Sequence, residues 1–146
     1  MNTSAIQKAI DVCAKKGGGR VELKPGIYLT GALYLKSNVE LHIGKEVTLK
    51  AVNRVEDFPD RATRVAGIEM VWPAAIINVI NQENVAITGE GVIDGDGKYL
   101  WDKYWAMRKD YDEQGLRWIV DYDCKQVRSL LVSESTNVTV SDLTFL

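Results

Sequence analysis

The feature that most constrains the fold of this chain is a short phrase that occurs three times. An Asn-Val pair at 38/39, 84/85 and 137/138 opens an alternation of apolar and polar residues each time. That period of two is typical of a β-strand with one buried face. The pairs lie 46 and 53 residues apart. Setting aside polar, turn-rich stretches near 53–75 and 97–126 leaves about 23 residues in each interval, a period that indicates a solenoid.

The middle copy, residues 83–97, shows how tightly such a coil would turn. Val85 and Ile87 alternate with small or polar neighbours and are followed by a Gly-Glu-Gly turn. A second short strand then runs into two consecutive turn dipeptides, Asp94-Gly95 and Asp96-Gly97. Because glycine adopts backbone conformations that other residues avoid, these positions suit sharp corners. No helical period fits this stretch.

The first residues have a helical period instead. Asn2, Thr3 and Ser4 are N-cap residue types, and an apolar face follows at Ala5, Ile6, Ala9, Ile10 and Cys13. A run of glycines at 17–19 would end the helix. Phosphate-binding loops place their glycines before a helix and after a strand, the reverse of this order. We therefore expect a helix over about 3–16 with a structural role.

From residue 20 the period changes to two, and five short strands fit before residue 50. They could form antiparallel hairpins, or they could wind in one direction as a coil; the 23-residue return favours the coil. We expect coils over about 20–52, 75–96 and 117–146, with strand resuming at 118–120. Two insertions separate them: a loop over about 53–74 and an excursion over about 97–116 that includes a short helix.

Composition excludes several classes of function. The 146-residue chain has a net charge of −2, which gives no electrostatic reason to expect a nucleic-acid partner, whose binding needs a basic face. Its longest apolar run, 71–80, is too short to cross a bilayer, and we expect no membrane association. The first residues lack the pattern of a signal peptide. Cys13 and Cys124 form no metal-binding spacing and are interpreted as buried thiols rather than a disulfide.

Several segments together resemble one known family. Residues 3–13, 17–31, 33–41, the Gly-Val-Ile-Asp-Gly-Asp-Gly run at 91–97 and the final stretch from 123 resemble, in this order, the N-terminal part of the polygalacturonase-type glycoside hydrolases. The resemblance implies an all-β fold, the single-stranded right-handed parallel β-helix of the pectin-lyase type. It also implies a parent enzyme that hydrolyses pectic galacturonan with inversion and without a cofactor. The helix near residues 5–13 would cap the open end of the solenoid.

The motifs that carry catalysis in this family do not occur here. The family uses Asn-Thr-Asp, Asp-Asp, Gly-His-Gly and Arg-Ile-Lys segments, and the chain contains none of them. We therefore expect residues 1–146 to be the N-terminal part of one β-helix domain, with no catalytic residue, metal site or cofactor of its own. The alternative is a non-catalytic β-helix module for carbohydrate binding or for structure. The family is usually secreted or periplasmic, and its partner is a pectic polysaccharide.

Two carboxylate pairs are candidates for chemistry. An inverting glycosidase needs an acid and a base roughly 6.5–9.5 Å apart, which residues two apart on a strand can approach. Asp94 and Asp96 have this spacing, but each precedes a glycine, which favours a role in turns. Asp121 and Asp123 have it too, and we interpret them as solvent-facing strand residues. Neither pair sits in a ligand-rich loop suited to calcium.

The remaining polar and aromatic candidates have structural interpretations. His42 alternates with apolar neighbours, so it should point outward without a metal-binding partner. The aromatic residues of the second insertion could stack on sugar rings or pack it onto the solenoid, and packing is favoured; they are Tyr99, Trp101, Tyr104 and Trp105. Asn38, Asn84 and Asn137 should stack as a ladder. An uncapped last coil would expose Val138, Val140, Leu143 and Phe145, and we expect self-association through them.

Overall fold

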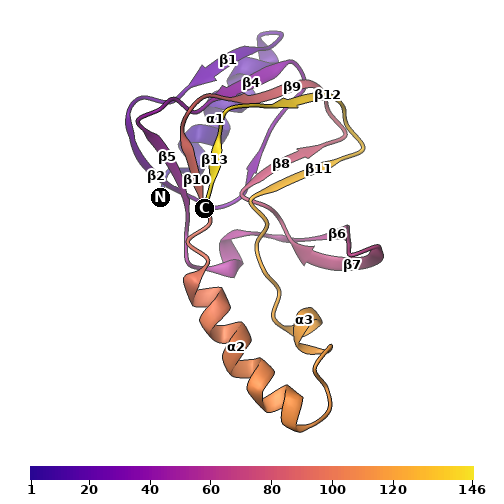
Figure 1. The fold of residues 1–146 in the computed structure, drawn as a ribbon. Helices are drawn as coiled ribbons and strands as arrows, with labels where there is room; N and C mark the ends of the chain where they lie inside the picture. Colours follow the sequence, from indigo (N-terminus) through magenta and orange to yellow (C-terminus); the bar gives the residue numbers. More distant parts are fainter.

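The computed structural model describes residues 1–146, the whole chain, and its strands wind into a parallel β-helix (Figure 1). Three parallel sheets run along it, here named sheets A, B and C. Sheet A contains β1 (Gly19–Glu22), β4 (Val39–His42), β9 (Glu83–Thr88) and β12 (Thr136–Val140). Sheet B contains β2 (Gly26–Thr30), β5 (Val47–Ala51), β10 (Val92–Asp94) and β13 (Thr144–Phe145). Sheet C contains β3 (Leu33–Tyr34), β8 (Ile77–Ile80) and β11 (Leu130–Ser133).

The register stacks like residues from successive coils. Leu41 pairs with Val21 below it and with Ile87 above it, and both Leu41 and Ile87 are fully buried. In sheet B the inward column is formed by Tyr28, Leu49, Ile93 and Phe145. Every pairing in sheets A, B and C is parallel, and each joins residues of consecutive coils. The coil interpretation is therefore correct, and the hairpin alternative is excluded for these strands.

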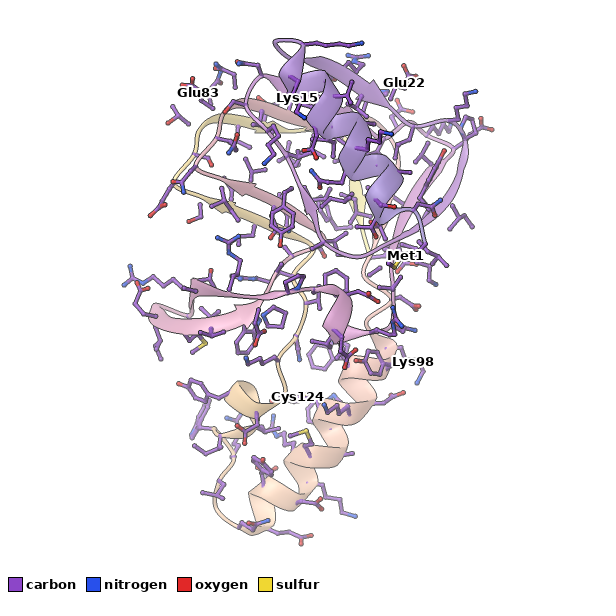
Figure 2. The ribbon with its side chains drawn as sticks, turned by 180° about the vertical axis from the view of Figure 1, so that it is seen from behind. Met1, Lys15, Glu22, Glu83, Lys98 and Cys124 are labelled. Atoms are coloured by element: carbon purple, nitrogen blue, oxygen red, sulfur yellow. The ribbon has the colours of Figure 1, made fainter.

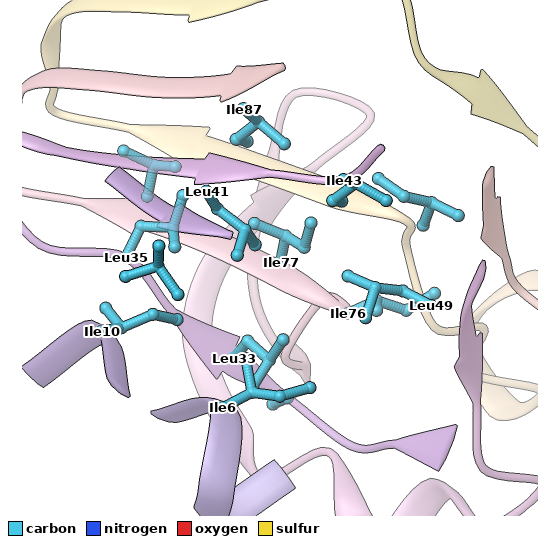
Figure 3. Close-up of a cluster of buried hydrophobic side chains, with 14 of the residues drawn as sticks. Ile6, Ile10, Leu33, Leu35, Leu41, Ile43, Leu49, Ile76, Ile77 and Ile87 are labelled. Atoms are coloured by element: carbon cyan, nitrogen blue, oxygen red, sulfur yellow. The ribbon is translucent and has the colours of Figure 1, made fainter. Parts of the chain in front are cut away.

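Helix α1 (Thr3–Lys15) closes the N-terminal end of the core. Figure 3 shows Ile6 and Ile10 of α1 facing Leu33 and Leu35 of the first coil. The buried face of α1 is narrower than expected. Ala5 and Ala9 are exposed, because the buried stripe follows the i, i+4 spacing of the two isoleucines only.

The start of α1 is also fixed differently from the expected N-cap. Asn2 makes no side-chain capping bond. Instead the backbone N–H of Gly31 donates to Thr3 Oγ1 at 2.8 Å, which ties the first turn of the helix to the end of β2. The helix is therefore positioned by the coil that it covers.

The first insertion is ordered, not a loop. After η1 (Val55–Asp57), β6 (Asp60–Val65) pairs antiparallel with β7 (Ile68–Pro73) in a two-stranded hairpin. Ala66 and Gly67 both have positive φ, 49° and 84°, as the turn of a two-residue hairpin requires. The expectation of a loop was wrong: β6 carries mostly polar residues, but β7 is largely apolar and pairs with it along its whole length.

The second insertion is helical: α2 (Lys98–Glu113) and α3 (Val120–Asp123). The expected strand at 118–120 is wrong, since the chain enters α3 there and strand resumes only in β11. The cause is a second apolar cluster, in which Val120 and Cys124 pack on Tyr104 of α2. No helix in the chain combines the length and apolar character needed to cross a membrane.

Both insertions leave the solenoid at the same corner, where sheet B passes to sheet C. The first follows β5 and the second follows β10, while the equivalent passage from β2 to β3 is short. Figures 1 and 2 show the hairpin and the helices extending from one side of the β-helix. Trp72 Nε1 of β7 donates to the carbonyl oxygen of Gln126 at 2.7 Å, and Lys125 pairs with Asp60 at 3.0 Å. The two insertions therefore support each other.

The predicted asparagine ladder is present. Asn38, Asn84 and Asn137 all adopt left-handed conformations, with φ of 63°, 55° and 52°. Asn84 Nδ2 donates to Asn38 Oδ1 at 3.1 Å, and Asn137 Nδ2 donates to Asn84 Oδ1 at 2.8 Å. The ladder marks the corner at which the chain turns into sheet A.

Candidate functional site

The first candidate, Asp94 with Asp96, lies at the corner from which the second insertion departs. The backbone N–H of Asp96 donates to Asp94 Oδ1 at 2.8 Å, which is the side-chain-to-backbone bond of a turn. Lys50 Nζ from the coil below lies 3.5 Å from Asp94 Oδ2 and 3.3 Å from Asp96 Oδ2. Asn53 Nδ2 also donates to Asp96, at 3.0 Å. These four residues form the corner cluster.

The corner cluster is held together by charge. The hydrogen bond to Asp96 is the main cause that raises the pKa of Lys50, and the negative charges of both aspartates add to it. The carboxylate oxygens therefore accept hydrogen bonds from a lysine, an amide and a backbone N–H. The turn-forming interpretation of Asp94 agrees with this geometry.

The second candidate pair lies on α3 rather than on a strand. Tyr104 Oη donates to Asp121 at 2.8 Å, and Tyr111 Oη donates to Asp123 at 2.7 Å. The bond to Asp123 is the main cause that raises the pKa of Tyr111. Although both aspartates are exposed, as expected, they anchor α3 to α2 rather than facing solvent from a strand. The predicted strand was wrong because Val120 packs on Tyr104 of α2 and the chain forms α3 at this point.

The aromatic residues of α2 divide between packing and exposure. Tyr104 is buried, whereas Trp101 and Trp105 are 51% and 56% exposed. The two indoles stack at a centroid distance of 6.4 Å and an angle of 22°. Arg108 Cζ lies 5.1 Å from the Trp105 ring centroid. Tyr104 packs on Val120 and Cys124 within the second insertion and not on the solenoid, so the expected packing onto the β-helix is not observed for this residue. Trp101 and Trp105 form an exposed aromatic surface on α2.

His42 points outward from sheet A, as expected, into a polar network. Thr88 Oγ1 donates to Glu40 Oε1, 2.6 Å away, and lies 2.9 Å from His42 Nδ1. Since the Thr88 proton is directed to Glu40, His42 Nδ1 is the donor of the second bond. Arg20 Nε completes the network by donating to Glu40 Oε2 at 2.9 Å. The network joins three coils across the outer face of sheet A.

Sequence reasoning missed an apolar groove between the two insertions. Its volume is about 250 Å³, and Met70 and Trp72 of the hairpin face Trp118 and Tyr122 across it. Trp118 is 69% exposed, and Arg117 lies over its ring at 3.9 Å. The expectation of a strand at 118–120 hid this groove, since it placed Trp118 on the solenoid.

Three parallel sheets around one apolar core, with a helical cap and an asparagine ladder, define this chain as part of a right-handed parallel β-helix. It is similar in structure to a hyperthermoactive exopolygalacturonase from Thermotoga maritima, with a TM-score of 0.75 and 28% identity over 98% of this chain and 37% of that one.

Sequence relatives give the same result. An exo-poly-alpha-D-galacturonosidase of Dickeya chrysanthemi is 38% identical over 66% of this chain. An endo-polygalacturonase of Pectobacterium parmentieri is 36% identical over 74% of it. No family model matches the chain. The chain is thus a homologue of the polygalacturonases, as its sequence motifs predicted.

The homology concerns only part of the length of those enzymes. The matched regions amount to 17% of the Dickeya protein and 29% of the Pectobacterium protein. The chain therefore spans less than a third of the curated relatives that it matches.

Proposed function

We propose that this chain is the N-terminal portion of an enzyme that hydrolyses pectic galacturonan by inverting acid and base catalysis, with its catalytic carboxylates outside residues 1–146. The similarity to exo- and endo-polygalacturonases over most of the chain carries this proposal. In such an enzyme, residues 1–146 supply the capped first coils and two insertions at the corner between sheets B and C. The reaction needs no cofactor, because two carboxyl groups suffice.

The contacts of the local carboxylates support this division of roles. The oxygens of Asp94 and Asp96 accept hydrogen bonds from donors of the same corner, the backbone N–H of Asp96 and the side chain of Asn53. Asp121 and Asp123 accept from tyrosine hydroxyls in the same way. These four carboxylates stabilise the corner cluster and the junction between α2 and α3.

Reducing-end release from polygalacturonate tests the proposal. We expect the protein as produced in its source to hydrolyse the polymer and residues 1–146 alone to release nothing. Loss of a general acid or base lowers kcat by roughly 10²–10⁴-fold. We expect Asp94→Asn in the whole protein to lower kcat far less than that. Turnover by residues 1–146 that Asp94→Asn abolishes would contradict the proposal.

One observation favours a second function, that of a non-catalytic module that binds carbohydrate. Trp101 and Trp105 present stacked, exposed rings of the kind that pack on the apolar faces of sugars. Affinity electrophoresis in a galacturonan gel tests it. Retardation that is lost in Trp101→Ala and kept in Trp118→Ala, an exposed tryptophan elsewhere, would favour this function if the whole protein shows no hydrolysis.

For residues 1–146 on their own we also propose self-association. Phe145 and Val140 are 43% and 39% exposed on the last coil, and the edges of β12 and β13 beyond that coil have no strand partner. Light scattering coupled to size exclusion should show dimers or larger species. A sharp monomer peak at 16.3 kDa would contradict this expectation.

A further inference from the structure

The hairpin of the first insertion has one strand edge that no other strand covers. β6 and β7 pair only with each other. The outer edge of β6 is contacted by the segment before β11, where Arg128 Nη1 lies 3.5 Å from the carbonyl oxygen of Arg64. No backbone hydrogen bond reaches the outer edge of β7, and Ile68 and Val71 of this strand are 47% and 53% exposed. Figure 1 shows the hairpin extending away from the β-helix. A free edge of this kind is a template for pairing with another strand.

The register of the hairpin determines which backbone groups point outward. Val65 and Ile68 flank the two-residue turn, so they form a hydrogen-bonded pair. Because hydrogen-bonded and non-hydrogen-bonded pairs alternate, the N–H and C=O groups of Glu69 and Val71 point away from β6. The next outward residue, Pro73, has no N–H to donate. The free edge therefore offers both backbone groups at Glu69 and Val71 and ends at Pro73.

One face of β7 is apolar and forms a wall of the apolar groove between the two insertions. Ile68, Met70 and Trp72 alternate along this face, and all three line the groove. Trp118 and Tyr122 line the opposite side and are 69% and 44% exposed. A strand with the same apolar alternation, paired with β7, would extend this face and remove apolar surface from water.

A second copy of β7 matches this edge in one antiparallel register. When Glu69 of each copy lies opposite Val71 of the other, each of these residue pairs exchanges both of its backbone hydrogen bonds. Met70 of one copy then meets Met70 of the other on the two-fold axis. On the same face, Ile68 of each copy lies opposite Trp72 of the other, so the apolar residues pair with each other. The edge is thus complementary to itself, as a two-fold interface requires.

The neighbouring registers are unfavourable. A shift by two residues in one direction places Glu69 opposite Glu69, and like charges directly opposite each other destabilise a strand pair. The same shift in the other direction places Glu69 opposite Pro73, which cannot donate the second hydrogen bond of the pair. In the favoured register the two Glu69 side chains are only diagonal neighbours, and Arg64 of its own copy lies 4.0 Å from each. Charge and hydrogen bonding therefore select the same register.

We propose that two copies of the chain form a two-fold symmetric dimer by antiparallel pairing of β7 with β7. The two hairpins then become one continuous sheet, and the apolar groove of each copy lies against it. This dimer does not depend on the proposed hydrolysis, and β12 and β13 of the last coil take no part in it. An interface built on one short strand belongs to the small, weak class, so monomers and dimers exchange.

Cysteine cross-linking at high micromolar concentration tests the register on the protein as produced in its source. Met70→Cys places two thiols in a non-hydrogen-bonded pair whose Cα atoms lie about 4.5 Å apart, a separation that a disulfide can bridge. We expect mild oxidation to give a covalent dimer with a 70–70 disulfide in its peptide map. Ile68→Cys is the matched control: it lies on the same face, but its two copies are far apart in this register. Equal cross-linking of the two variants, or none in Met70→Cys beyond that of the unmodified protein, would overturn the proposal.

Analytical ultracentrifugation of edge variants tests the backbone pairing. Val71→Pro removes an outward N–H and no hydrogen bond of the hairpin, so we expect the dimer dissociation constant to rise at least about tenfold. Val71→Thr keeps the N–H and the β-branched side chain and should leave the constant unchanged. A monomer at every concentration of the unmodified protein would assign the edge to another partner and overturn the proposal. Unchanged association of a folded Val71→Pro would place the contact elsewhere and overturn it too, and cross-linking decides the case if this variant does not fold.

Discussion

Asn84 lies directly above Asn38 in the next coil, and its amide donates a hydrogen bond to the Asn38 side chain at 3.1 Å. Since Asn84 also accepts from Asn137, this one residue joins three coils at a solvent-exposed corner. Its left-handed backbone, with φ of 55°, is what lets the side chain point along the solenoid axis.

Replacing Asn84 should therefore destabilise the fold in two separable ways. Asn84→Ala loses two side-chain hydrogen bonds and places alanine in a left-handed conformation, so we expect a loss of about 2–3 kcal/mol in the free energy of unfolding. Asn84→Gly loses the hydrogen bonds but tolerates the backbone, and should cost about 1 kcal/mol less than alanine. Urea unfolding measures both, and equal losses would contradict the role given to the backbone.

Gly91 is required by close packing between coils. A Cβ atom there would lie 2.5 Å from Ile43 Cγ2 and 2.6 Å from the carbonyl oxygen of Gly44. We expect Gly91→Ala to cost about 1–3 kcal/mol, since the clash involves the backbone of a buried coil. Gly97→Ala is the matched control, because its Cβ would meet nothing closer than 3.9 Å. Similar midpoints for the two variants in thermal unfolding would show that the coils can separate at no cost.

The network on the outer face of sheet A predicts a pH dependence. Hydrogen bonds, first from Arg20 and then from Thr88, lower the pKa of Glu40 below its ordinary value of 4.5. A lowered pKa in the folded state stabilises the protein above the unfolded value, and this stabilisation is lost as the pH falls through the folded value. The effect should be small, because Arg20 is exposed.

NMR titration of the Glu40 carboxyl group checks this prediction directly. Arg20→Gln should raise the pKa of Glu40 and flatten the pH dependence of stability in the acid range. Thr88→Val should act in the same direction, since it removes the second donor. An unchanged Glu40 pKa in both variants would show that the network is not formed in solution.

The two free cysteines should differ in reactivity. Burial raises the pKa of the Cys124 thiol, which is 2% exposed and packs with Tyr104 and Val120. Cys13 is partly accessible beside the end of α1. Because the thiolate is the reactive form, iodoacetamide at pH 8 should label Cys13 well before Cys124. Mass spectrometry of the labelled peptides gives both rates, and faster labelling of Cys124 would mean that α3 detaches from α2 readily.

The solenoid could be predicted from sequence because its signal is local and repeated. The Asn-Val pairs and the alternation around Leu41 and Ile87 encode both the coil period and the ladder. The structure of the two insertions could not be predicted in this way, because it depends on contacts outside the repeat. The first strand of the hairpin is mostly polar and resembles a loop in sequence. Helix α3 forms where Val120 packs on Tyr104, sixteen residues earlier in the chain.

The contact between the hairpin and the segment before β11 illustrates a further limit. Arg128 lies 65 residues after Thr63, whose side chain it contacts, and nothing in the local sequence links the two. Only the fold of the hairpin brings them together. The carboxylate candidates were easier to find because each pair is close in sequence, but their partners, Lys50 and the two tyrosines, came from the fold.

Both insertions occupy one corner, so sequence changes in the insertions are separated from sequence changes in the paired strands. The paired strands keep their register whether the intervening passage is a short bend, a hairpin or a pair of helices. A lineage can therefore exchange the segment at that corner, coil by coil, without redesigning the core. The solenoid then serves as a constant frame, and the segments attached at this corner can differ in length and in secondary structure.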